Sequence, residues 1–197
     1  MTKFYKRLFS IKEAHNTMFE AFSTMKYFKK ARQNETISQD FSERIMLAVT
    51  QVNGCEICNY YHTEEALKSG MSDVEIKNLV QGDESTVPTA EIKAIMFAKH
   101  YADTLGKVNQ QALNEFKKYY GQEQSLAILG AIRIIMMGNA YGIPLSALKR
   151  RLKNDAVAKS SLHYEVLILL SFIPSIVIAF VKVIFNSKDV VKNYLLD

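Results

Sequence analysis

Residues 47–62 read LAVTQVNGCEICNYYH and predict a helix, a tight turn and the start of a second helix. Apolar residues recur at three- and four-residue spacing from Phe41 to Val52, which indicates an amphipathic helix over about residues 40–52. Asn53-Gly54 breaks that pattern. A second helix is expected over about residues 55–69, because Gly70 is a favourable residue just after a helix end. The two helices should therefore form a hairpin.

The two cysteines share one face of the second helix with a histidine. Cys58 lies three residues after Cys55, and His62 lies four residues after Cys58. At about 100° per residue the three side chains fall within an arc of about 60°. The thiolate is the nucleophilic form of cysteine, and histidine ordinarily titrates near neutrality, so His62 is placed to take the Cys58 proton. The spacing therefore indicates thiol–disulfide redox chemistry.

Glu43 is the carboxylate that can orient the imidazole. At 1.5 Å per residue it lies about 16 Å from the turn along the first helix, and His62 lies about 12 Å along the second. If the hairpin is nearly antiparallel, the offset is roughly one helical turn, which a glutamate side chain spans. A carboxylate that holds the histidine would complete a proton relay.

The composition limits the fold classes and the kinds of partner that are expected. The chain has 197 residues, 48% of them hydrophobic, with only 8 glycines and 3 prolines, and we expect an all-α fold. The net charge of +5 comes without a basic stripe or a reading motif, so no nucleic-acid partner is expected. Two cysteines do not make a secreted disulfide scaffold, and no signal peptide is apparent, so we expect a cytoplasmic protein.

A zinc site is the common alternative for a Cys-x-x-Cys pair. Structural zinc needs four ligands, usually with a second Cys or His pair. The remaining histidines, His15, His100 and His163, are scattered along the chain, so no metal is expected. Two inert cysteines are the other alternative.

The rest of the chain predicts further helices and two segments. Helices are expected over residues 11–32, from Ser72, over 89–105, 109–120 and 122–138, and from Pro144 to about Lys153. We expect a redox domain over residues 1–155. An apolar C-terminal helical segment should follow over residues 156–197, with a kink at Pro174.

The chain resembles the alkyl hydroperoxidase D-like proteins of the carboxymuconolactone decarboxylase-like superfamily. The resemblance rests on the spacing Glu43, eleven residues, Cys55, two residues, Cys58, three residues, His62. The stretch before Cys55 and the helix that ends at Gly70 are also similar, so the clear resemblance covers about residues 38–82. The helices up to about residue 153 are compatible with it.

The resemblance implies an all-α bundle that assembles as a homo-oligomer, a trimer or hexamer, and reduces hydroperoxides. Cys58 would be the attacking thiolate and Cys55 the resolving thiol, with Glu43 and His62 as the proton relay. No bound cofactor is implied, but an external dithiol donor would be needed, such as a lipoyl-type adaptor or a thioredoxin-like protein. Helix-terminus electrostatics alone would instead favour Cys55 as the attacking thiol.

Ile57 is a departure from the family pattern. The best-known members carry a second histidine directly before the second cysteine, where this chain has Ile57. One relay group is missing, which favours slower peroxide turnover or a different thiol–disulfide exchange. Two other functions stay open: a decarboxylase-like activity, and a non-enzymatic redox-sensing or membrane-docked interaction protein that uses the disulfide as a switch.

Residues 166–185 are the most apolar run of the chain, and Lys182 is their one charge. A membrane-spanning helix needs about 20 apolar residues. Basic residues from Lys149 to Lys153 precede the run, as expected beside a membrane surface. Two interpretations are open: a membrane-associated segment, or a helix buried in an oligomer interface or a larger bundle.

Overall fold

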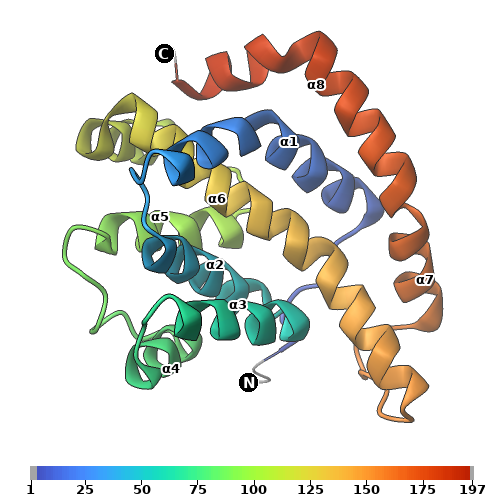
Figure 1. The fold of residues 1–197 in the computed structure, drawn as a ribbon. Helices are drawn as coiled ribbons and strands as arrows, with labels where there is room; N and C mark the ends of the chain where they lie inside the picture. The colour runs from blue at the N-terminus through green and yellow to red at the C-terminus, as the bar shows by residue number, and fades with distance from the viewer. Residues whose placement is uncertain (1–3, 196–197) are drawn as a thin grey trace.

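The fold was obtained as a computed structural model that describes residues 4–195, with side chains described up to residue 185. Within this range the chain forms only helices, which confirms the all-α prediction (Figure 1). The eight described helices are α1 (Ile11–Gln33), α2 (Gln39–Asn53), α3 (Glu56–Lys68), α4 (Asp73–Gln81), α5 (Ile92–Asp103), α6 (Gln110–Leu152), α7 (Leu162–Leu170) and α8 (Phe172–Leu195).

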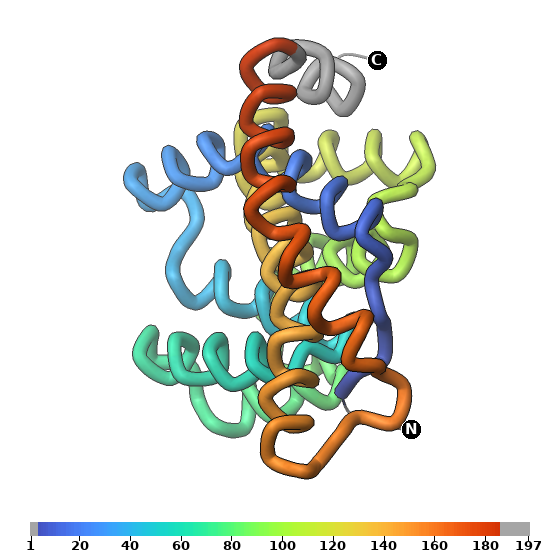
Figure 2. Tube along the Cα trace, turned by 90° about the vertical axis from the view of Figure 1, so that its right-hand side faces the viewer, coloured from blue at the N-terminus to red at the C-terminus, as the bar shows by residue number. Residues whose placement is uncertain are grey.

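The long helix α6 runs through the middle of the bundle and contacts α1, α2, α3, α5 and α7. Helix α1 packs along it on one side, and the α2–α3 hairpin, α4 and α5 lie on the other (Figure 1). Figure 2 shows α8 along the outer face of the bundle, where it contacts α1 and α6. The core lies where α1, α2 and α5 meet α6, and it includes Met18, Ile45, Ile95 and Ile132.

The sequence predicts three interruptions in the stretch that forms α6, and the structure has one of them. Gly121 has a positive φ of 71° and separates residues 110–120 from the rest, as predicted. The predicted end at Gly138 and the predicted start at Pro144 are wrong, because the helix continues through both. Proline removes one helical hydrogen bond. Burial of Ala140, Ile143 and neighbouring side chains against the bundle outweighs that loss.

The turn between α2 and α3 is held by the N-terminal segment. Gly54 caps α2 in the left-handed conformation, with φ of 76°. Its carbonyl accepts a hydrogen bond from the Tyr5 backbone N–H at 2.7 Å. A Cβ at Gly54 would lie 2.7 Å from the Lys6 nitrogen, so only glycine allows both the conformation and this approach. The turn therefore fixes where α3 begins.

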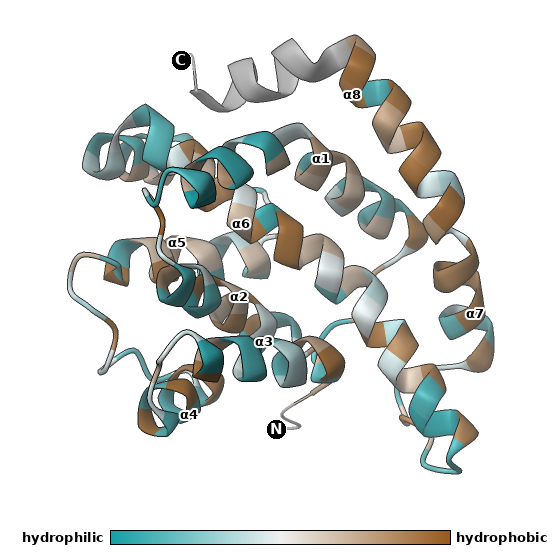
Figure 3. Ribbon diagram, in the orientation of Figure 1, coloured by the Kyte–Doolittle hydropathy of each residue, from teal (hydrophilic) through white to brown (hydrophobic). Residues whose placement is uncertain are grey.

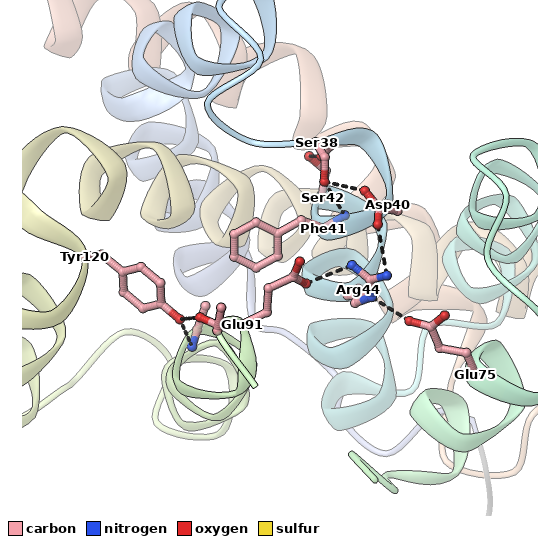
Figure 4. Close-up of polar contacts among 10 residues, drawn as sticks. Ser38, Asp40, Phe41, Ser42, Arg44, Glu75, Glu91 and Tyr120 are labelled. Carbon is pink, nitrogen blue, oxygen red and sulfur yellow. Dashed lines mark hydrogen bonds and ion pairs between the residues drawn. The ribbon is translucent and has the colours of Figure 1, made fainter. Parts of the chain in front are cut away.

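A buried arginine joins α2, α4 and the start of α5 (Figure 4). Arg44 contacts Glu75 at 2.5 Å, Glu91 at 2.9 Å and Asp40 at 2.9 Å. Burial raises the pKa of Glu91 above its ordinary value, against the opposing attraction of Arg44. In the same region the Tyr120 hydroxyl hydrogen-bonds backbone groups at the start of α5. The cluster holds α4 and α5 against the helix that carries Glu43.

The C-terminal segment is bent before its proline. Helix α7 ends at Leu170 with Ser171 as its C-cap, and Pro174 stands in the first turn of α8, where its missing N–H costs no helical hydrogen bond. The kink expected at Pro174 is therefore a helix boundary three residues earlier. Glu165 of α7 is buried and accepts two hydrogen bonds of 2.8 Å from Arg151 of α6. The domain boundary near residue 155 stays a prediction.

Candidate active site

The cysteine pair lies at the start of α3, where helix geometry brings the two sulfurs together. Cys55 is the N-cap residue, and the Cys58 backbone N–H points to its sulfur at 3.3 Å. The two residues form a disulfide with their Cα atoms 5.3 Å apart. Cys55 is fully buried, whereas 8% of Cys58 is exposed. The sequence prediction began α3 at Cys55, and the structure makes that residue the cap instead.

The disulfide lies directly against the backbone of α6. A Cβ placed on Gly142 would be 2.7 Å from the Cys58 sulfur and 2.8 Å from the Cys55 sulfur, closer than Cβ atoms approach other atoms. One turn earlier, the Gly138 carbonyl oxygen is 3.6 Å from the Cys58 sulfur. The continuous helix and its bare backbone at Gly142 therefore form the wall behind the cysteine pair.

The structure brings Glu43 and His62 together, as the hairpin geometry predicts. Glu43 Oε2 and His62 Nδ1 are 2.7 Å apart across α2 and α3. The other carboxylate oxygen of Glu43 accepts a hydrogen bond from Gln39 Nε2 at 2.7 Å. Their side chains are mostly buried, with 6% of Glu43 and 14% of His62 exposed. A carboxylate on Nδ1 fixes the ring, and Nε2 is then the nitrogen that can exchange a proton.

Cys58 and His62 line one cavity of about 550 Å³, which lies within the size range of ligand pockets. Its walls come from α3, α6 and the junction of α7 with α8: Ile57, Cys58, Tyr61, His62, Ile135, Gly138, Tyr141, Gly142, Leu145, Leu169 and Phe172. Cys55 does not line it. The burial of Cys55 and the spacing of Cys58 to His62 therefore both favour Cys58 as the thiol that meets a substrate.

Sequence reasoning missed the residues that α6 contributes. Gly138 and Gly142 stand four residues apart, which places them on one face of a helix, but Gly138 was interpreted as a helix end and Gly142 was not singled out. Gln39, which holds Glu43, gave no sequence signal. His15, His100 and His163 lie on other helices and do not line this cavity. Within the described residues, no three His, Cys, Asp or Glu side chains gather as metal ligands would.

The sequence pattern of the "Carboxymuconolactone decarboxylase family" matches residues 17–100, a range that includes Glu43, both cysteines and His62. Residues 17–100 are therefore similar to the sequences of that family. The carboxymuconolactone decarboxylase family match covers α2 and α3 entirely, so the hairpin that carries the site lies inside it.

One relative extends the similarity beyond the family match. The chain is 24% identical over 128 residues to the "Uncharacterized protein YdfG" of Bacillus subtilis (strain 168), which is 64% of this chain and 87% of that protein. No solved structure matches the chain. The carboxymuconolactone decarboxylase family includes more than one chemistry, so the reaction has to be argued from the site itself.

Proposed function

We propose that this protein is a dithiol oxidoreductase that reduces hydroperoxides. Cys58 is the attacking thiolate, Cys55 the resolving thiol, and Glu43 with His62 the proton relay. The observation that carries the proposal is that Cys58 and His62 line one cavity while Glu43 holds Nδ1 of His62 at 2.7 Å. A base that is oriented in this way can generate the thiolate and later return the proton.

The reaction begins from the reduced dithiol. The Cys58 thiol gives its proton to His62, and the thiolate attacks the distal oxygen of the hydroperoxide. The O–O bond breaks, the alcohol leaves with the proton from His62, and Cys58 becomes a sulfenic acid. The Cys55 thiol then attacks the Cys58 sulfur, so that a disulfide forms and water leaves. The two electrons that reduce the hydroperoxide come from the two thiols, which end as the disulfide.

An external dithiol would restore the enzyme by thiol–disulfide exchange through a mixed disulfide. A lipoyl-type adaptor or a thioredoxin-like protein has the right chemistry. Cys58 is the sulfur that such a donor would attack, because Cys55 is fully buried behind it. A cytoplasmic location would suit this cycle, since that compartment supplies reduced donors. Assembly as a trimer or hexamer remains part of the proposal.

The test is peroxide turnover with thiol counting on the purified chain. The reduced protein is given a limiting amount of tert-butyl hydroperoxide, with and without dihydrolipoamide. We expect two thiols lost per hydroperoxide consumed and full recovery with the donor. Cys58→Ser should abolish consumption, and Cys55→Ser should stop at a sulfenic acid that dimedone traps. Turnover that survives Cys58→Ser would refute the mechanism. Oxidation of the pair without catalytic turnover would support a redox switch instead.

A further inference from the structure

We infer that the outer face of α7 and α8 lies on an anionic phospholipid bilayer, and that the cavity at Cys58 takes acyl-chain hydroperoxides from it. The docking part stands on the surface of these two helices. The substrate part rests on the proposed function, because it names the substrate class of the same site.

The outer face of α7 and α8 is an exposed apolar surface. Among the described residues, two apolar stretches are long enough to cross a membrane. In the most apolar 18-residue window of each, 78% is buried in α6, against 17% in the stretch over Leu162–Phe185. Core packing therefore explains α6 and not α7 and α8. Exposed fractions reach 68% at Leu170, 64% at Ile173 and 80% at Phe185. Figure 3 shows this hydrophobic colouring along α7 and the described part of α8.

The two charges of this stretch are engaged with the body of the protein. Glu165 is buried and bound by Arg151. Lys182 lies with Nζ 3.3 Å from His15 Nε2 and 5.8 Å from the centre of the Phe19 ring, both on α1. A helix that faces water carries its charged residues outward. In this stretch Glu165 is buried, and Lys182, although exposed, reaches toward α1, so both charges are turned toward the body, as expected of a helix that faces lipid.

The segment lies flat rather than projecting. Helix α7 packs on α6, and α8 packs on α1, so both lie along the body (Figure 2). This geometry fits a helix pair seated in the bilayer interface rather than one that spans the membrane. Lys149, Lys153 and Lys159 are exposed at the end of α6 and in the loop before α7. Their positive charges beside the apolar face complement anionic headgroups.

The cavity opens onto this same face. Leu169 and Phe172, at the α7–α8 junction, line the cavity that contains Cys58 and His62. Phe172 is 37% exposed and also packs edge-on against Tyr141, with ring centres 4.9 Å apart. The apolar surface and the cavity are therefore continuous at Phe172.

The chemistry of the cavity selects an apolar substrate. Among the described residues that line the cavity, His62 is the one titratable group beside the sulfur, apart from tyrosine hydroxyls, and the other walls are apolar or glycine. Ile57 adds an apolar wall directly beside Cys58. An acyl chain would bury its length against these walls while its hydroperoxide group meets Cys58 and His62. A second copy of the chain seated on this face would close the mouth at Phe172, whereas a fluid bilayer supplies substrate through it.

Docking is tested by flotation of the full chain with vesicles. Vesicles of phosphatidylcholine and phosphatidylglycerol are compared with phosphatidylcholine alone. We expect binding to the anionic vesicles and at least about a tenfold loss in the double variant Leu170→Glu, Ile173→Glu. The matched control is Val74→Glu on α4, which is 64% exposed and far from this face in the fold. It should bind as the wild type does.

Absence of binding to anionic vesicles would overturn the docking proposal. The docking proposal would also be overturned if light scattering showed that the wild type is an oligomer and that the double variant is a monomer. A second copy of the chain would then cover this face. Leu170 and Ile173 are surface positions, so the variants should fold, and circular dichroism is the control for this.

The substrate part uses two hydroperoxides with the same protein. Phosphatidylcholine hydroperoxide in anionic vesicles should be reduced by the wild type and at least about tenfold more slowly by the double variant. Turnover of soluble tert-butyl hydroperoxide should be equal in both. Equal rates on the vesicle substrate would overturn the substrate assignment. Failure with both hydroperoxides would refute the proposed function, while vesicle flotation would still decide the docking.

Discussion

Replacement of Gly142 by alanine should make the oxidised form of the site less stable than the reduced form. The new Cβ would lie 2.7 Å from the Cys58 sulfur and 2.8 Å from the Cys55 sulfur. Two sulfurs joined in a disulfide against α6 cannot both move away from it. Two separate thiols can each rotate about Cα–Cβ, so the reduced protein accommodates the methyl group more easily.

The size of the effect follows from packing. One extra methyl group in a tightly packed site costs about 1–3 kcal/mol. The gain in helix propensity from glycine to alanine, about 1 kcal/mol, applies equally to both redox forms and cancels. For a two-electron couple, 1.4 kcal/mol corresponds to about 30 mV, so the midpoint potential should rise by about 20–65 mV.

The assay is a redox titration in dithiothreitol buffers, with free thiols counted at each ratio. Gly138→Ala is the matched control, because it lies one turn away on the same helix. Its Cβ would meet Ile135 at 3.6 Å, an ordinary contact. We expect a midpoint near that of the wild type for Gly138→Ala and a clear positive shift for Gly142→Ala. Equal midpoints for both variants would refute the argument that α6 presses on the disulfide.

Three further predictions concern the residues that support the site. Glu43→Gln should slow hydroperoxide turnover by about 10²-fold, with the disulfide still formed, because His62 loses the carboxylate that orients it; initial rates with thiol counts check this. Arg151 hydrogen-bonds Glu165 and lowers the pKa of that carboxyl. The stability that this gives is present above the ordinary value of 4.5 and is lost as the pH falls through the lowered pKa. Glu165→Gln should therefore cost about 1.5–3 kcal/mol at neutral pH, and urea melts should show the difference shrink in acid. Arg44→Met removes the buried partner of the partly buried Glu75 and Glu91 and should cost about 3–5 kcal/mol at neutral pH, which the same urea melts measure; an unchanged midpoint would contradict the bridging role of Arg44.

Local signals in the sequence predicted the hairpin and the candidate site residues on it. Helical periodicity, Asn53-Gly54 and the three- and four-residue spacings depend on neighbours in the chain, so they can be read without the fold. The meeting of Glu43 with His62 followed from the same information, because a short antiparallel hairpin leaves few relative positions for two helices. The structure has them 2.7 Å apart.

The same local reasoning failed where distant segments decide the outcome. Gly138 predicts a helix end and Pro144 a helix start, yet packing of α6 against its neighbours keeps the helix continuous. The need for a glycine at Gly142 appears only when α3 sets two sulfurs against it. Contacts of this kind join residues more than eighty positions apart in the sequence, so a local sequence pattern cannot predict them.

The sequence by itself determined the helical fold class, the hairpin and the close approach of Cys55 and Cys58, since each rests on local spacing and side-chain identity. The tertiary structure alone decided which sulfur lines the cavity and which side of α7 and α8 stays uncovered. The sequence pattern of an apolar helix is the same whether the helix packs on protein or on lipid, because the hydrophobic effect has no direction. Only the packed bundle shows that Leu170 and Ile173 lie outside it, beside the mouth of the cavity.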